Sequence, residues 1–304
     1  MGAKKLFADP VLLLCPLRSF SSVVCAMLGR HPELYGMPEL NLFLDDRLDE
    51  LIIRHRRRPF RAHGVLRALA HLHDGEQTEA AVERAKEWIW LHRTYSTKEV
   101  FDHLIELVHP HRVLEKSPST SLLPGRLERL FRMYPNAAIL HLTRHPRSTC
   151  RSMLRLVPRV GSTYEDGDEP ADLAVHGLEP EAIWLRSHRN ILDFCGRLPQ
   201  HQWMRIKGEE LLSNPDTVLT QVCWWLGLKM DGAILHSMRH PEHSPYACLG
   251  PRNAAFGNDP GFLTNPAFRQ GCPEKPGLDG ELEWAARTYF SQDTRDLAHR
   301  LGYD

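Results

Sequence analysis

The amino-acid sequence predicts an α/β fold of three layers, in which helices cover both faces of a central parallel sheet. Short, wholly apolar segments such as 11–15 and 137–143 have the length and composition of strands that are buried on both faces. Longer segments with helical periodicity lie between them, and strands that alternate with helices form parallel sheets. The first strand leads through a polar loop into a helix, which is the layout of a phosphate-cradling loop.

Each element follows from local composition. The predicted strands are short and mostly apolar, and they are 11–15, 34–36, 112–116, 137–143 and 202–207. The predicted helices show apolar residues at helical spacing or Pro and Gly at their ends, and they are 23–28, 125–134, 147–156, 183–198, 214–225 and 281–301.

Two long stretches have a different character. Residues 40–110 are predicted to be helical, with breaks near Pro59, Gly64 and Gly75, and the basic run Arg54–Arg58 is expected to be a solvated helix end. Residues 241–278 contain many Pro and Gly and are predicted to be loop.

Length and composition limit the class of protein. The 304 residues suit one large α/β domain or two small ones, and we expect a single domain over 1–304. A hydrophobic content of 42% with 25% charged residues excludes a wholly disordered chain. Seven cysteines without a CxxC pair disfavour a zinc site or a disulfide scaffold.

The charge balance limits the partners. The 38 basic and 38 acidic residues cancel, so no nucleic-acid partner is expected. No apolar run reaches the roughly 18–20 residues that a membrane span needs, so we expect a cytoplasmic protein without a span. Arginine supplies 30 of the 38 basic residues, which fits either a coding bias or planar recognition of phosphate.

The loop after the first strand carries donors suited to an anion. It reads Pro16-Leu-Arg-Ser-Phe-Ser-Ser22 and offers hydroxyl groups, one guanidinium and the amides at the start of the next helix. It lacks the G-x-x-x-x-G-K-[ST] pattern of nucleotide triphosphatases. A serine-rich loop can also simply cap a helix, so the loop alone leaves both readings open.

A second anion site is predicted after the strand 137–143. Arg144 ends this strand, and Ser152 follows eight residues later, about two turns into the next helix. Arg147 and Arg151 share one face of that helix, where they could equally be exposed charges.

Together these segments resemble the PAPS-dependent sulfotransferase family, whose cofactor is 3′-phosphoadenosine 5′-phosphosulfate (PAPS). The loop 16–22 resembles the family's P-loop-like phosphosulfate loop, and Arg144 with Ser152 matches its 3′-phosphate pair. Glu115-Lys-Ser-Pro118 and Glu39-Leu-Asn-Leu-Phe43 resemble segments of carbohydrate-type members. Residues 205–228 resemble the late strand and helix of bacterial members, including stand-alone and polyketide-tailoring ones.

The resemblance implies a role for each matched residue. Glu39 would be the general base for the acceptor hydroxyl, Lys116 would contact the sulfuryl or bridging oxygens, and Arg18 would neutralise the leaving phosphate. The residues implied in cofactor binding are Arg18, Ser19, Phe20, Ser21, Ser22, Arg144 and Ser152. No metal is required in this scheme.

Two features depart from the family pattern. Leu17 is an additional residue, and Phe20 stands where the family usually has a glycine, whose freedom to adopt positive φ allows close backbone approach. The sequence therefore leaves the geometry of this loop open.

The late segment offers further candidates. Arg252 and Asn253 are predicted as a second contact to the 3′-phosphate, because the family often closes over the nucleotide with a late basic loop. His240 or His243 is an alternative base, since histidine titrates near neutral pH. The segment 250–259 could also be only a turn-rich connection.

The expected function is sulfuryl transfer from PAPS to a hydroxyl of a small molecule, lipid, sugar or carrier-bound acyl chain. We expect the helical segment 45–110 to cover the acceptor side and the acidic segment 161–177 to act as a lid. One alternative is a non-catalytic nucleotide-binding protein of the same fold, which Phe20 favours. The other is a small-molecule kinase, which the missing Gly-Lys-Ser/Thr disfavours. The sequence leaves the acceptor and the oligomeric state open.

Overall fold

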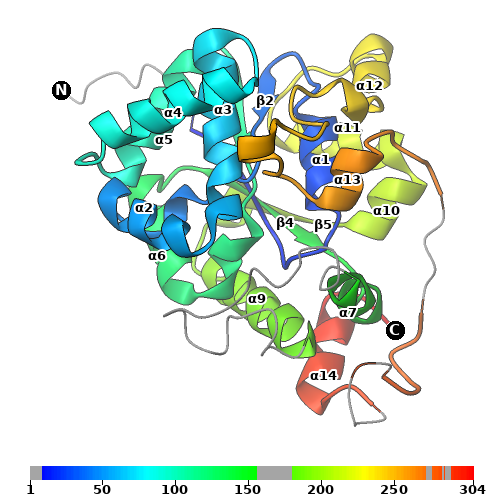
Figure 1. Ribbon diagram of the computed structural model, residues 1–304. Coiled ribbons are helices and arrows are strands. Elements are labelled where there is room, and N and C mark those ends of the chain that lie inside the picture. Colours follow the sequence, from blue (N-terminus) through cyan, green and yellow to red (C-terminus); the bar gives the residue numbers. More distant parts are fainter. Residues whose placement is uncertain (1–8, 156–179, 272–275, 283, 285–288) are drawn as a thin grey trace.

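A computed structural model describes residues 9–155, 180–271, 276–282, 284 and 289–304 (Figure 1). Its centre is a five-stranded sheet in the order β2-β3-β1-β4-β5. The strands are β1 (Val11–Leu14), β2 (Leu34–Gly36), β3 (Arg112–Glu115), β4 (Ala138–Thr143) and β5 (Trp203–Lys207). All neighbouring strands pair in parallel, which confirms the predicted parallel sheet.

Alternate residues of the strands face two separate cores. Leu12 and Leu14 of β1 point into one core, and Val11 and Leu13 point into the other. Because successive side chains of a strand point to opposite faces, a strand that is apolar throughout must be covered on both sides. The three predicted layers are therefore present.

Helices form the two outer layers. The first core packs the sheet against α2 (Leu48–Arg57), α3 (His63–Asp74), α4 (Glu79–Leu91), α5 (Thr97–Val108), α6 (Pro124–Met133) and α9 (Pro180–Cys195). The second core packs it against α1 (Ser21–Leu28), α10 (Gly208–Ser213), α11 (Pro215–Trp225) and α12 (Gly232–Met238). The remaining α-helices of the described residues are α7 (Pro146–Leu154), α13 (Pro260–Thr264) and α14 (Gln292–Arg300). No helix among the described residues is long and apolar enough to cross a membrane.

The predicted closing helix over 281–301 is wrong in its first part, because α14 begins only at Gln292. Ser291 caps this helix by accepting a hydrogen bond from the Thr294 amide. Upstream, the guanidinium of Arg147 donates hydrogen bonds to main-chain carbonyl oxygens of residues 277–281. Carbonyl oxygens that turn toward one side chain are not available to a helical ladder. Arg147 is therefore a buried structural residue rather than an exposed helix charge.

Two other predictions need adjustment. The loop predicted over 241–278 contains the short helix α13 and 3₁₀ helices at Pro241–His243 and Arg252–Ala254. The helix α12 was not predicted at all. The acidic segment 161–177, which we expected to act as a lid, lies outside the described residues.

Candidate active site

A cavity of about 500 Å³ opens where the chain leaves the carboxyl ends of the sheet strands. Its wall includes the loop after β1, Glu39 after β2, Ser119 after β3 and Arg144 after β4. The segment 256–269 forms the remaining side. The carboxyl edge of an open parallel sheet is the usual place for a ligand, and the volume suits one.

The loop between β1 and α1 adopts a strained backbone. Arg18 and Phe20 have φ angles of 67° and 65°, in the left-handed region that non-glycine residues rarely occupy. The structure thus places Phe20 in a conformation that glycine adopts more readily. The ring has room because residue 208 is a glycine, where a Cβ would lie 2.5 Å from Phe20 Cδ2. The Arg144 guanidinium stacks over the same ring at 3.9 Å, which stabilises this arrangement.

Arg18, Arg144 and Ser152 come together as the sequence predicted. Arg18 Nε donates to Ser152 Oγ at 3.0 Å, and Arg144 donates to the Arg18 carbonyl oxygen at 2.6 Å. Burial, opposed by Glu209 and assisted by the neighbouring Arg18, lowers the pKa of Arg144 to about 10. The guanidinium still carries its charge at neutral pH, so two cations face this end of the cavity.

Two buried polar atoms at this end have no partner among the described residues. They are Ser19 Oγ, on a side chain with no exposed surface, and Arg144 Nε. The first turn of α1 also receives no side-chain cap from Phe20, its N-cap residue. Buried polar groups are nearly always hydrogen-bonded in native proteins, so these donors indicate a place for an acceptor-rich anion.

Lys116 joins the loop to Glu39. Its Nζ donates to Ser22 Oγ at 2.9 Å and to Glu39 Oε1 at 2.6 Å. Glu39 is 27% exposed and lines the cavity, whereas Lys116 has no exposed surface. Lys116 therefore lies behind Glu39 and Ser22 and does not line the cavity wall. A residue that contacts a sulfuryl group in the cavity would have to lie on that wall.

A hydrogen-bonded group that was not predicted from the sequence lies next to Glu39, and Asn41 Nδ2 donates to the Glu39 carbonyl oxygen at 3.5 Å. Asn41 has a φ of 53°, its N–H donates to Ser117 Oγ at 2.9 Å, and its Oδ1 accepts from Ser119 Oγ at 2.6 Å. Ser117 in turn donates to Glu115, a fully buried carboxyl group whose pKa burial raises to about 7. Asn tolerates the left-handed conformation better than most residues, which was the available sequence signal.

Glycines hold the main chain of Glu39 from two sides. The Glu39 N–H donates to the Gly257 carbonyl oxygen at 2.7 Å. A Cβ at Gly64 would lie 1.9 Å from the Glu39 carbonyl oxygen, so only glycine fits there in this backbone arrangement. The sequence pattern predicted Gly64 only as a helix break, and the contact of Gly257 with Glu39 was not predicted.

Four predicted residues lie away from this cavity. Arg252 and Asn253 form a 3₁₀ turn against α3 and α4, where Asn253 donates to the Glu79 carbonyl oxygen and to Glu83. His240 is hydrogen-bonded to Glu242 at 2.7 Å and its ring is stacked on His243. His240 lines a separate surface hollow beside α11 and α12. The structure does not bring these residues to the cavity wall.

The basic run on α2 is only partly a solvated helix end. Arg54 forms an ion pair with Asp45 at 2.6 Å, but Arg58 lines the cavity together with Arg61. The cavity wall thus combines these cations with apolar side chains of Phe60, Leu122 and Phe256.

Comparisons with known proteins agree with this geometry. No curated protein matches the chain. The fold is similar to the sulfotransferase domain from the curacin biosynthetic pathway, with a TM-score of 0.77, 22% identity and 99% of each chain covered. It is also similar to the sulfotransferase domain from the Synechococcus PCC 7002 olefin synthase, with a TM-score of 0.74, 24% identity and coverage of 100% of this chain and 98% of that one. Residues 10–232 match the model of the Sulfotransferase family, and the chain therefore belongs to this family.

Proposed function

We propose that this protein transfers a sulfuryl group from PAPS to a hydroxyl acceptor. One observation carries the proposal: a carboxylate suited to be a base, Glu39, and a cationic anion-binding loop line the same cavity, with Lys116 bonded to both. Family membership supports the reaction class. We also propose that residues 1–304 form one sulfotransferase domain, with the helices α2–α5 on its acceptor side.

The residues present fit the cofactor. Ser19 Oγ and the uncapped first turn of α1 offer donors to a 5′-phosphosulfate, and Arg18 offers a guanidinium. Arg144, through its unpartnered Nε, and Ser152 would hold the 3′-phosphate, as the family resemblance implies. When bound, PAPS supplies the sulfuryl group and a phosphate that leaves with the electrons of the broken sulfur–oxygen bond.

The protein's own groups would act by positioning and by charge stabilisation. Arg18 and the α1 amides would stabilise the negative charge that develops on the leaving phosphate. The Glu39 carboxylate would accept the proton of the acceptor hydroxyl as its oxygen bonds to sulfur. Lys116 would orient Glu39 from behind through its hydrogen bond, so we propose a positioning role for it rather than a contact with the reacting atoms.

The cavity gives the acceptor an apolar wall beside two arginines. Small molecules, lipids, sugars and carrier-bound acyl chains that carry a hydroxyl group all remain acceptors to screen.

A substitution at Glu39 tests the base. Glu39→Gln keeps the size and an acceptor oxygen for Lys116 but cannot take a proton, so turnover of PAPS with an acceptor should fall by about 10²–10⁴-fold. Binding of the product 3′-phosphoadenosine 5′-phosphate (PAP), measured by calorimetry, should stay within about twofold. Glu33→Gln, at an exposed position before β2, is the matched control and should leave both unchanged. Normal turnover in Glu39→Gln would show that Glu39 is not the base.

Assays with PAPS, PAP and ATP distinguish the proposed sulfotransferase from the two alternative functions. A sulfotransferase should release PAP from PAPS in the presence of an acceptor and should be stabilised against heat by PAP. A non-catalytic member of the fold would be stabilised by PAP but would leave PAPS intact. A small-molecule kinase would turn over ATP. Failure of PAP to raise the melting temperature at millimolar concentration would refute the proposed cofactor.

A further inference from the structure

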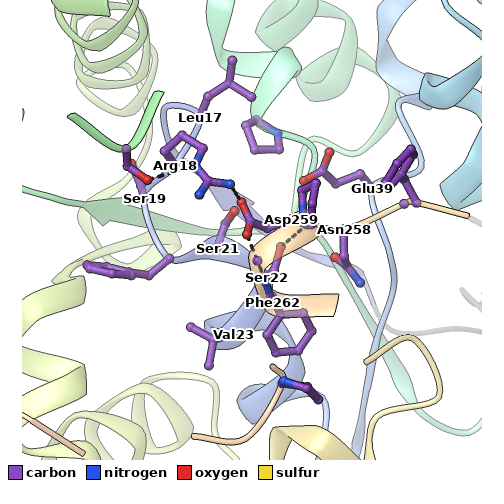
Figure 2. Close-up of a pocket in the computed structure, with 18 of the residues that line it drawn as sticks. Leu17, Arg18, Ser19, Ser21, Ser22, Val23, Glu39, Asn258, Asp259 and Phe262 are labelled. Carbon is purple, nitrogen blue, oxygen red and sulfur yellow. Dashed lines mark hydrogen bonds and ion pairs between the residues drawn. The ribbon is translucent and has the colours of Figure 1, made fainter. Parts of the chain in front are cut away.

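The carboxylate of Asp259 occupies the anion-binding loop. It forms an ion pair with Arg18, and the Asp259 main-chain N–H donates to Ser22 Oγ at 3.0 Å (Figure 2). The Asp259 side chain is 25% exposed, and it lines the cavity with both of its partners. Arg18 and Ser22 belong to the loop that we propose for the 5′-phosphosulfate.

The chain around Asp259 holds this carboxylate in place. Asp259 is the N-cap of α13, where its Oδ1 accepts from the Phe262 amide at 3.1 Å. Two residues earlier, the Gly257 carbonyl oxygen accepts the hydrogen bond from the Glu39 amide. Gly257 also packs closely on Gly64, because a Cβ on Gly257 would lie 2.8 Å from the Gly64 Cα. The carboxylate is therefore presented to Arg18 by an anchored segment and not by a freely rotating surface residue.

This arrangement places two anions in competition for one cation. A guanidinium binds carboxylates and phosphates through the same planar N–H donors, so the two groups are direct substitutes for each other. Two negative groups close to the same Arg18 would repel each other. Building on the proposed function, we propose that Asp259 is an internal competitor for the 5′-phosphate group, which must displace it to bind.

The competition affects both the binding and the release of the nucleotide. In the protein without nucleotide, Asp259 keeps the Arg18 guanidinium paired, which lowers the affinity for any ligand that must separate them. When PAP leaves, the returning carboxylate replaces its 5′-phosphate on Arg18. The 3′-phosphate does not compete with Asp259, because its proposed partners are Arg144 and Ser152.

Isosteric removal of the charge tests this proposal. Asp259→Asn keeps the helix cap, because Asn is as good an N-cap as Asp, but it has no negative charge and cannot form the ion pair with Arg18. We expect calorimetry to show that PAP binds Asp259→Asn about tenfold more tightly than wild type, since a charge-assisted pair no longer has to be broken. Adenosine 3′-phosphate, which lacks the 5′-phosphate, should bind both proteins within about twofold.

Asp231→Asn is the matched control. Asp231 caps α12 in the same way, by accepting from the Ile234 amide at 2.8 Å, but it does not line the cavity. This variant should bind both nucleotides as wild type does. Asp259→Ser, which also preserves a cap, repeats the test if the Asn variant does not fold.

The outcomes are distinct. Unchanged or weaker PAP binding in Asp259→Asn, with normal binding in wild type, overturns the role of Asp259 alone. An equal gain for adenosine 3′-phosphate also overturns it, because the effect would not depend on the 5′ anion. If PAP binds to neither protein at millimolar concentration, the proposed cofactor fails and this inference fails with it.

Discussion

Gly64 makes the position of Glu39 sensitive to a single methyl group. It is the second residue of α3, and a Cβ there would lie 1.9 Å from the Glu39 carbonyl oxygen and 2.6 Å from the carbonyl carbon. Real Cβ contacts essentially never fall below 3.0 Å, so Gly64→Ala must move the helix and the Glu39 main chain apart by about 1 Å. Both neighbours are backbone, so no flexible side chain can absorb the shift.

The expected effect has two parts. Overpacking of this kind destabilises a protein by about 1–3 kcal/mol, and the better helix propensity of Ala offsets about 0.5–1 kcal/mol of it. If Glu39 is the base, a displacement of about 1 Å should also lower kcat/KM by about 10²-fold. Urea unfolding measures the first part, and PAP release from PAPS with an acceptor measures the second.

Gly125→Ala provides the matched control. Gly125 is also the second residue of its helix, α6, but it is exposed, and a Cβ there would meet nothing within 4 Å. This variant should gain about 0.5–1 kcal/mol of stability and keep its activity. If the Gly64→Ala variant is as stable in urea unfolding as the Gly125→Ala variant, the packing argument is refuted. A destabilised but fully active Gly64→Ala would refute the link to Glu39.

Two further predictions concern charge and protonation. Arg144→Ala should weaken PAP binding by about tenfold or more in calorimetry, because a charge-assisted contact is lost, while Arg252→Ala should not change it; equal losses would refute this assignment of the 3′-phosphate contact. Burial lowers the pKa of His141 to about 3 and that of its partner His188 well below the usual value, so the unfolded chain binds more protons below pH 6.5. Stability should therefore fall as the pH drops from 6.5 toward 4, by about 1.4 kcal/mol per pH unit for each histidine. His141→Gln should reduce this slope in urea unfolding, the exposed control His201→Gln should not, and an unchanged slope in His141→Gln would contradict the argument.

Local sequence predicted the sheet well and the late helices less well. All five strands were predicted to within about one residue at each end, because a short apolar run between polar turns has few other uses in a protein of this composition. The start of α14 was not predictable, because Arg147, 134 positions before Glu281, binds the Glu281 carbonyl oxygen, at which the predicted helix would have begun. A contact of that separation leaves no periodic signal in the segment itself.

Local sequence was enough to predict which residues meet at the cavity from the ends of β1, β2 and β4. Arg18, Ser22, Glu39 and Arg144 follow strand ends, and the carboxyl ends of parallel strands share one edge of the sheet, so their meeting follows from local pattern and strand direction.

The rest of the site depends on contacts between segments that are distant in the sequence. Which part of the long segment 241–269 reaches the cavity depends on packing against α3, Glu39 and the first loop, and not on its own composition. That packing brings Asp259 to Arg18 and leaves Arg252 and Asn253 against α4, although Arg252 had the more suitable charge for a phosphate. Likewise, Lys116 at the end of β3 is buried behind Glu39, because Ser22 and Glu39 lie between it and the cavity.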